Sequence, residues 1–227
     1  MKNEEYQQFR EHLGKKVTLV AVSKLQPIEA INRLYHFGHR DFGENYVQEL
    51  IEKQMLLHHD IKWHFIGHLQ SNKIKYIAPF IHLIQSVDSF KLLMEIDRQG
   101  NKLNRRINCL LQVNISSEDT KYGLQVAELD EMVNGITHAA EMNGMNNIMV
   151  MGLMGMASFS ADEDKVRAEL KYLSTLYDKY SHIETSNFRF KYLSMGMSAD
   201  YRVAIEEGSN MVRIGSLVFG ERKQSSV

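Results

Sequence analysis

Residues 17–23 read Val-Thr-Leu-Val-Ala-Val-Ser, and Lys24 follows them directly. A short, continuous apolar run rich in β-branched residues is typical of a strand that is buried on both faces, as strands of parallel sheets are. Pro27 then favours the start of a helix, because proline is tolerated in the first helical turn. This segment therefore predicts a buried parallel strand with a lysine at its C-terminal end.

The same alternation of strand-like and helix-like patterns continues to the end of the chain. Alternation of this kind predicts a parallel sheet whose crossover connections are helices. The expected strands are residues 17–23, 39–43, 63–66, 83–86, 107–115, 148–153, 188–194 and 211–214.

Eight strands with crossover helices match a (β/α)8 TIM barrel, and 227 residues lie at the compact end of the range for that fold. The competing architecture is an open doubly wound sheet. It normally has a glycine-rich loop after its first strand, where this chain has Ser-Lys-Leu-Gln-Pro at 23–27. We expect one α/β domain over residues 1–227, with an extra N-terminal helix over 1–14 and the barrel over 17–220.

The composition is that of an ordinary globular protein with mixed charges. The formal net charge is −1, without runs of like charge, so we expect no nucleic-acid partner and no membrane partner. The N-terminus shows no apolar signal segment, and no stretch is long and apolar enough for a membrane span. Cys109 is the single cysteine and is expected to be a buried structural thiol in a reducing compartment. These features predict a cytoplasmic protein, which we expect to be a monomer.

Functional groups of a TIM barrel lie at the C-terminal ends of its strands. Lys24 occupies this position after the first strand. Because the preceding run is apolar, desolvation would lower the pKa of this amine and leave a neutral nucleophile that can form a Schiff base with a carbonyl cofactor. The alternative is a solvated surface lysine, which is more common at strand ends.

Small and hydroxyl residues follow the seventh and eighth expected strands, where TIM barrels usually bind phosphate. Ser198 is a candidate N-cap of the next helix, beside backbone N–H groups that can bind an anion. Gly215 permits close backbone approach, and Ser216 adds a hydroxyl. Each feature alone could be an ordinary cap or turn, but two clusters at adjacent strand ends favour a phosphate site.

Other polar residues allow more than one interpretation. Arg213 is compatible with a phosphate ligand, a structural ion-pair partner or a group that faces a cofactor ring nitrogen. His64 and His68 invite a metal site, but they lie on an expected strand and its end, where this spacing does not bring two imidazoles together. Since no cysteine or carboxylate cluster is evident beside them, we expect structural or surface histidines and no metal site.

At this point the chain resembles a known family, the pyridoxal phosphate homeostasis proteins, also called the YggS/PROSC type. The resemblance extends along nearly the whole chain and is most specific around Trp63 and Leu193. The matching segments are residues 21–24 (AVSK), 41–45 (DFGEN), 63–73 (WHFIGHLQSNK), 112–115 (QVNI), 152–154 (GLM), 193–200 (LSMGMSAD), 212–216 (VRIGS) and 219–222 (FGER).

The resemblance implies a single barrel similar to the N-terminal domain of alanine racemase, with pyridoxal 5′-phosphate held as a Schiff base on Lys24. It also implies that Arg213 faces the ring nitrogen and that Asn45 makes a polar contact near the cofactor. Phosphate contacts are implied for Ser198, Gly215 and Ser216. The family often has a Thr-Lys pair at residues 25–26 and a small residue at position 122, whereas this chain has Leu-Gln and a tyrosine. These departures touch none of the matched cofactor positions.

Binding and catalysis make different demands on such a site. An arginine against the pyridine nitrogen disfavours ring protonation and weakens the ring as an electron sink. A racemase also needs a second base, and the given sequence has no residues after Val227 for the additional domain that supplies it in alanine racemase. We therefore expect a non-catalytic carrier that limits free pyridoxal phosphate and passes it to apo-enzymes. The alternatives are a weak amino-acid racemase, with Tyr122 or Tyr192 as second base, and a cofactor-free structural barrel.

Overall fold

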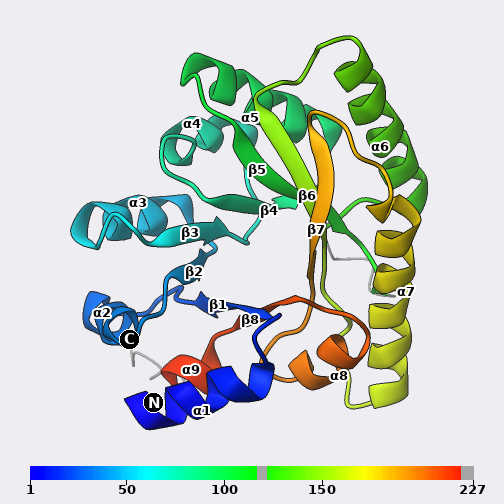
Figure 1. The fold of residues 1–227 in the computed structure, drawn as a ribbon. Coiled ribbons are helices and arrows are strands. Elements are labelled where there is room, and N and C mark those ends of the chain that lie inside the picture. Colours follow the sequence, from blue (N-terminus) through cyan, green and yellow to red (C-terminus); the bar gives the residue numbers. More distant parts are fainter. Residues whose placement is uncertain (117–121, 221–227) are drawn as a thin grey trace.

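The structure is a computed structural model, and it describes residues 1–116 and 122–220. Within these residues, eight parallel strands form one closed barrel in chain order, and β1 is bonded to both β2 and β8. Helices surround the strands on the outside (Figure 1). The closed barrel confirms the predicted (β/α)8 fold and excludes the open doubly wound sheet.

The observed strands agree with the predicted ones to within two residues at either end. Each is short, and most of their side chains are buried because the strand has the barrel interior on one face and the helices on the other. The strands are β1 (Thr18–Val22), β2 (Asp41–Glu44), β3 (Lys62–Phe65), β4 (Leu83–Val87), β5 (Ile107–Val113), β6 (Ile148–Gly155), β7 (Phe188–Ser194) and β8 (Met211–Ile214).

Side-chain N-caps mark the start of two crossover helices. The Ser89 hydroxyl accepts a hydrogen bond from the Leu92 N–H, and the Asp162 carboxylate accepts one from the Lys165 N–H, so that two helices have side-chain caps. The helices are α1 (Asn3–Leu13), α2 (Ile28–His36), α3 (Val47–Leu56), η1 (Ser71–Lys73), α4 (Ile74–Ile77), α5 (Phe90–Lys102), α6 (Val126–Glu141), α7 (Glu163–Ser181), α8 (Tyr201–Glu206) and α9 (Ser216–Phe219). Among the described residues, none of them is long and apolar enough to cross a membrane.

Buried apolar side chains form two separate clusters. The larger one fills the space between the strands and the helices, and it includes Cys109, whose thiol pKa is raised by burial. The smaller one joins β4, β5 and β6 with β8 and β1, which lie across the barrel from them, and only side chains inside the barrel can make such contacts. It consists of Val20, Leu83, Leu110, Met154 and Met211, with Met151, Met156 and Tyr192 packed against it.

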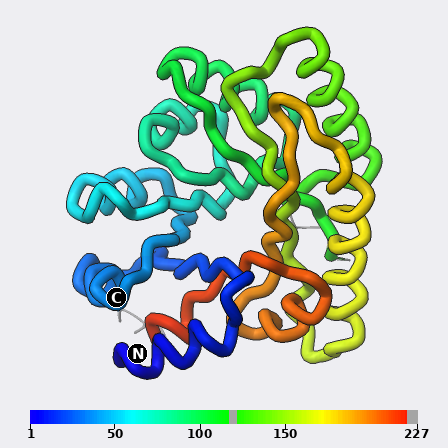
Figure 2. The backbone as a smooth tube through the Cα atoms, viewed as in Figure 1, coloured from blue at the N-terminus to red at the C-terminus, as the bar shows by residue number. Residues whose placement is uncertain are grey.

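The extra helix α1 lies along the outside of the barrel beside α8 (Figure 2), where Phe9 packs against Tyr201. It also secures the segment that precedes β2. The Tyr6 hydroxyl lies 2.9 Å from Nδ1 of His39, and Nε2 of His39 lies 2.7 Å from the Asp41 carbonyl oxygen. Both ring nitrogens of this buried histidine therefore have partners that belong to the folded state.

Burial lowers the pKa of His39 to about 4, so the folded protein holds this imidazole neutral. The unfolded chain binds a proton near pH 6.5, and stability is therefore complete above that pH and falls as the pH drops from about 6.5 towards 4, by about 3 kcal/mol in total. We expect His39→Gln to flatten this part of the pH dependence of unfolding in urea. His138→Gln, on an exposed helix face, is the control. An unchanged slope in His39→Gln would contradict the assignment.

Candidate functional site

The six predicted site residues come from four neighbouring strands. Lys24 follows β1, Asn45 follows β2, and Ser198 lies in the loop after β7. Arg213 is within β8, and residues 215–216 begin α9 directly after it. Because β7, β8, β1 and β2 are consecutive in the barrel, the parallel direction of the strands brings all six to its C-terminal end.

Gly215 lies against the end of β1. A Cβ atom at this position would lie 3.4 Å from the carbonyl oxygen of Val22 and 3.5 Å from its Cβ atom. The backbone of the β8–α9 turn therefore approaches β1 two residues before Lys24. Ser216 is exposed at this turn, and Lys24 itself is partly buried.

Arg213 is 4% exposed and points into the barrel. Its Nη1 donates to the Ser194 hydroxyl at 2.7 Å, and its Nη2 donates to the Gly155 carbonyl oxygen at 2.9 Å. Burial lowers the pKa of this guanidinium to about 10, which leaves it charged at neutral pH. Among the described residues no carboxylate lies within ion-pair distance of Arg213, so the structure gives no support to the structural ion-pair interpretation.

A chain of hydrogen bonds connects Arg213 to the other end of the barrel. The Ser194 hydroxyl donates to Oε1 of Gln85 at 2.7 Å, and Nε2 of Gln85 lies 3.0 Å from Nδ1 of His64. Nε2 of His64 in turn lies 3.1 Å from Oδ1 of Asp41. This series runs from a buried cation to a carboxylate, so each bond is polarised in the same sense and holds the guanidinium in place. Gln85 was not among the predicted site residues, although a glutamine inside the apolar strand Leu-Ile-Gln-Ser-Val was a signal.

A buried lysine braces the turn that carries Lys24. Nζ of Lys53 donates to the Ser23 carbonyl oxygen at 2.6 Å, to Oε1 of Glu44 at 2.7 Å and to Oε1 of Glu49 at 2.6 Å. Glu49 also accepts a hydrogen bond of 2.6 Å from the N–H of Leu25. Both sequence neighbours of Lys24, Ser23 and Leu25, are therefore hydrogen-bonded to one ion cluster. Leu25 has a left-handed φ of 60°, which is uncommon for a residue other than glycine.

Glu44 is fully buried within this cluster, and burial raises its pKa against the opposing charge of Lys53. Sequence analysis did not identify these residues. The spacing of Glu49 and Lys53, four residues apart on a predicted helix, was compatible with an ordinary surface pair. Only the packing of α3 against β1 and β2 turns it into an internal brace.

Ser198 does not occupy the predicted N-cap position. Helix α8 begins at Tyr201, and its N-cap residue is Asp200. The Asp200 carboxylate accepts a hydrogen bond of 2.6 Å from the Met197 N–H, and the N–H groups of Asp200 and Tyr201 return to the Met197 carbonyl oxygen. This turn uses the residues that would have formed the first helical turn after Ser198, so the cap prediction was wrong. Ser198 instead lies partly buried within the loop.

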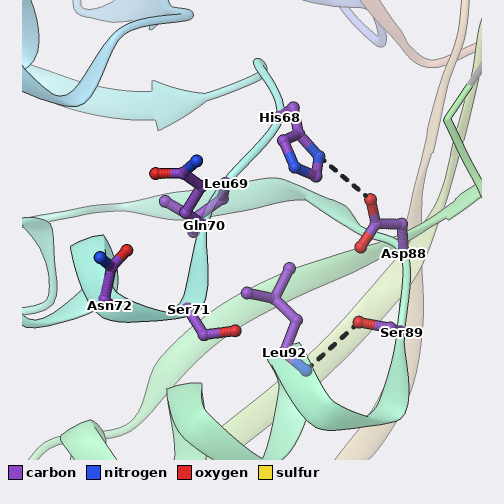
Figure 3. A pocket seen from close by; sticks show the side chains of 8 residues that line it. All are labelled: His68, Leu69, Gln70, Ser71, Asn72, Asp88, Ser89 and Leu92. Atoms are coloured by element: carbon purple, nitrogen blue, oxygen red, sulfur yellow. Dashed lines mark hydrogen bonds and ion pairs between the residues drawn. The ribbon is translucent and has the colours of Figure 1, made fainter.

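Two cavities open beside this end of the barrel, next to the predicted site. One of about 490 Å³ is bordered by Asn45, Tyr46, Gln70, Lys73 and Tyr76, among others. The second, of about 440 Å³, lies between the segments after β3 and β4 (Figure 3), with His68 and Asp88 pointing toward each other across 3.4 Å. Tyr122 stacks on the other side of His68 at 4.4 Å between ring centroids. His68 is thus a surface residue, as predicted.

Oδ1 of Asn45 is buried and has no hydrogen-bond partner among the described residues. An orphaned buried acceptor at the C-terminal face is costly unless a ligand or a water molecule supplies the donor. With a lysine amine, a buried guanidinium and a turn that allows close backbone approach, this end of the barrel can bind an anionic ligand that also carries a carbonyl group.

Comparison with known proteins agrees with the fold. The family model described as "Alanine racemase, N-terminal domain" matches residues 3–223. This defines the class, a barrel of the alanine racemase N-terminal type. An alanine racemase of Clostridium difficile has the same fold, with a TM-score of 0.74 at 15% identity, and the match covers 98% of this chain and 57% of the racemase.

Curated relatives specify the family within that class. The pyridoxal phosphate homeostasis protein of Aquifex aeolicus is 39% identical over 206 residues, which are 90% of this chain and 87% of the relative. The protein of the same name from Escherichia coli is 37% identical, over 92% of this chain and 87% of the relative. The chain therefore belongs to the pyridoxal phosphate homeostasis protein family, which confirms the resemblance seen in the sequence.

Solved structures of PipY from Synechococcus elongatus superpose on most of the chain. The structure without pyridoxal phosphate has a TM-score of 0.88 at 33% identity and covers 97% of this chain and 100% of PipY. The structure with pyridoxal phosphate bound has a TM-score of 0.85 at 32% identity and covers 96% and 99%, respectively.

Proposed function

We propose that this chain binds pyridoxal 5′-phosphate through a Schiff base on Lys24 and contributes to homeostasis of that cofactor without being an enzyme. The observation that carries the proposal is the convergence of Lys24, Asn45, Arg213 and the 215–216 turn at one end of the barrel. Family membership and the cofactor bound in PipY support the identity of the ligand.

Each residue has a specific part in this proposal. The Lys24 amine attacks the aldehyde carbon, a C=N bond forms, and the aldehyde oxygen leaves as water. The orphaned Oδ1 of Asn45 takes a donor from the ligand or its water. Gly215 and Ser216 hold the phosphate where their backbone can approach it closely, and Ser198 adds a hydroxyl from the neighbouring loop.

Arg213 favours binding over carbanion chemistry. Its guanidinium is charged at neutral pH and is fixed by Ser194 and Gly155. A fixed cation at the pyridine nitrogen opposes protonation of the ring, and the cofactor then withdraws electrons from a substrate Cα less effectively. We therefore propose a carrier that lowers free pyridoxal phosphate and hands it to apo-enzymes in the cytoplasm, acting as a monomer.

The cofactor and its anchor are tested by the visible spectrum of purified protein with added pyridoxal phosphate, before and after borohydride. We expect a new band in the wild type that borohydride removes, with the cofactor then attached to Lys24. Lys24→Ala should lose the band, whereas Lys75→Ala, an exposed lysine on α4, should keep it. A band that survives in Lys24→Ala would refute the anchor.

Catalysis is tested separately by deuterium exchange at Cα of alanine and serine. A carrier should exchange no faster than free pyridoxal phosphate. Exchange that disappears in Lys24→Ala would be the minimum support for the racemase alternative, and absence of exchange would rule it out. Tyr192 is a poor second base because its ring packs against the apolar interior of the barrel.

Transfer of the cofactor is tested by mixing loaded protein with an apo-enzyme in the presence of a scavenger for free cofactor. Light scattering determines the oligomeric state.

A further inference from the structure

Three titratable side chains meet at the end of the barrel opposite to the proposed cofactor site. Asp41 begins β2, His64 lies in β3, and His82 directly precedes β4. These strands are consecutive in the barrel (Figure 1). One ligand atom from each residue lies within 4.8 Å of the other two. The sequence-based expectation that no carboxylate lies beside these histidines is therefore wrong for His64, because neighbouring strands supply groups that are distant in the chain.

Burial and neighbouring groups shift the pKa values of two of the three side chains. Burial lowers the pKa of His82 to about 4, with a further contribution from His64. Burial by itself would raise the pKa of Asp41, but its hydrogen bond to His64 and the charge of Lys62 outweigh this and lower it.

His82 makes no hydrogen bond through its ring to any of the described residues, although it is partly buried. Its ring lies 5.4 Å from that of His64, centroid to centroid, at an interplanar angle of 57°. The ring can therefore turn toward the His64–Asp41 pair without breaking a hydrogen bond to a described residue, unlike the ring of His39, whose two nitrogens both have partners.

The His64 ring is already oriented by a neighbour outside the cluster. Nδ1 of His64 lies 3.0 Å from the amide nitrogen of Gln85, which directs Nε2 toward Asp41 at 3.1 Å. Two tetrahedral ligands about 2.0–2.1 Å from a zinc ion are roughly 3.3 Å apart, so this pair already has the required separation. Metal-binding histidines usually donate their second ring N–H to an oxygen atom, and Gln85 can supply Oε1 for this role when its amide is turned over.

We propose that Asp41, His64 and His82 bind a divalent transition metal of the zinc type at the N-terminal end of the barrel. Two imidazoles and one carboxylate suit zinc or cobalt, whereas calcium and magnesium prefer ligands that are all oxygen. Nε2 of His64 becomes a ligand atom when its proton is lost to solvent and one is taken up at Nδ1, with the Gln85 amide turned over so that Oε1 accepts from the new N–H. Small rotations of the side chains close the remaining distances, and water completes the coordination. Because the ligands come from three strands, the ion joins β2, β3 and β4.

Cobalt(II) chloride added to metal-free protein is the first probe, since tetrahedral cobalt absorbs visible light. We expect one ion per chain, displacement by zinc, and a rise in the thermal midpoint of about 5–10 °C when free zinc exceeds its dissociation constant 100-fold. His82→Gln should weaken binding by at least about tenfold, the loss expected when a coordinating or orienting group is removed. Its fold without metal should be preserved, because the His82 ring has no hydrogen bond to lose among the described residues.

Two matched histidine variants distinguish this site from adventitious binding. His68→Gln removes an exposed histidine at the opposite end, and His58→Gln removes one that lies near His36 on the surface. Both should bind cobalt as the wild type does. The proposal is overturned if no cobalt spectrum forms, if His82→Gln binds with wild-type affinity, or if His58→Gln or His68→Gln abolishes binding. None of these outcomes depends on the proposed cofactor.

Discussion

Replacing Lys53 with methionine should lower the free energy of unfolding by about 3–5 kcal/mol, the usual cost of removing one partner from a buried ion pair. Lys53 is 4% exposed, and Glu44, one of its two acidic partners, is fully buried. Methionine retains most of the volume but leaves Glu44 without its cation and the Ser23 carbonyl oxygen without its donor. The measurement is urea unfolding at pH 7.5.

Two further variants make this result specific. Lys75→Met replaces an exposed lysine of α4 and should change stability by less than about 0.5 kcal/mol. The double variant Glu44→Gln/Lys53→Met should be less destabilised than the sum of its two single variants, because it leaves no uncompensated charge at Glu44. If Lys53→Met alone costs less than about 1 kcal/mol, the cluster does not brace the Lys24 turn as described.

Gly152→Ala should lower the free energy of unfolding at least as much as Lys53→Met does. We expect a loss above about 4 kcal/mol, or one sufficient to prevent soluble folding. Gly152 lies in β6 opposite Tyr192 of β7 and has a φ of 142°, a region that L-residues rarely occupy. A Cβ atom there would lie 1.8 Å from the Tyr192 carbonyl oxygen. Since that oxygen belongs to the backbone of the neighbouring strand, the clash can be relieved only by separating β6 from β7.

Gly38→Ala provides the matched control for backbone conformation. Gly38 also has a positive φ, of 92°, but a Cβ atom at this position would meet nothing within 4 Å. Its substitution should therefore cost only the conformational penalty of about 1–2 kcal/mol. The two variants are compared by expression in soluble form and by urea unfolding. Similar losses in both would show that the β6–β7 contact contributes nothing beyond the backbone conformation.

Local patterns were sufficient for the strands and for the class of fold. Each strand is buried on two faces, so its apolar run is continuous and visible without knowledge of its neighbours, as in residues 107–113. The positions of Lys24 and Arg213 at or near strand ends also followed from local order. The specific motifs around Trp63 and Leu193 identified the family, which the comparisons confirm.

Side-chain partnerships that cross the barrel were beyond such patterns. Gln85 meets His64, Ser194 and Met211 because β3, β4, β7 and β8 enclose one interior, and the sequence separations are as large as 126 residues. The meeting of Asp41 with His64 and His82 depends in the same way on strand register. For Ser198 the local pattern was misleading. Serine is a good capping residue, but the turn formed by Met197 and Asp200 makes Asp200 the N-cap of α8.

The order of strands and helices, the family, and the residues expected to meet the ligand could thus be predicted from the chain, because they depend on local periodicity and on continuous motifs. The groups that hold those residues in place became visible only in the folded barrel: the Lys53 cluster around the Lys24 turn, and the hydrogen-bonded series from Arg213 to Asp41. A buried polar group must find its partner in space. Closure of the barrel, rather than distance along the chain, determines which partner is near.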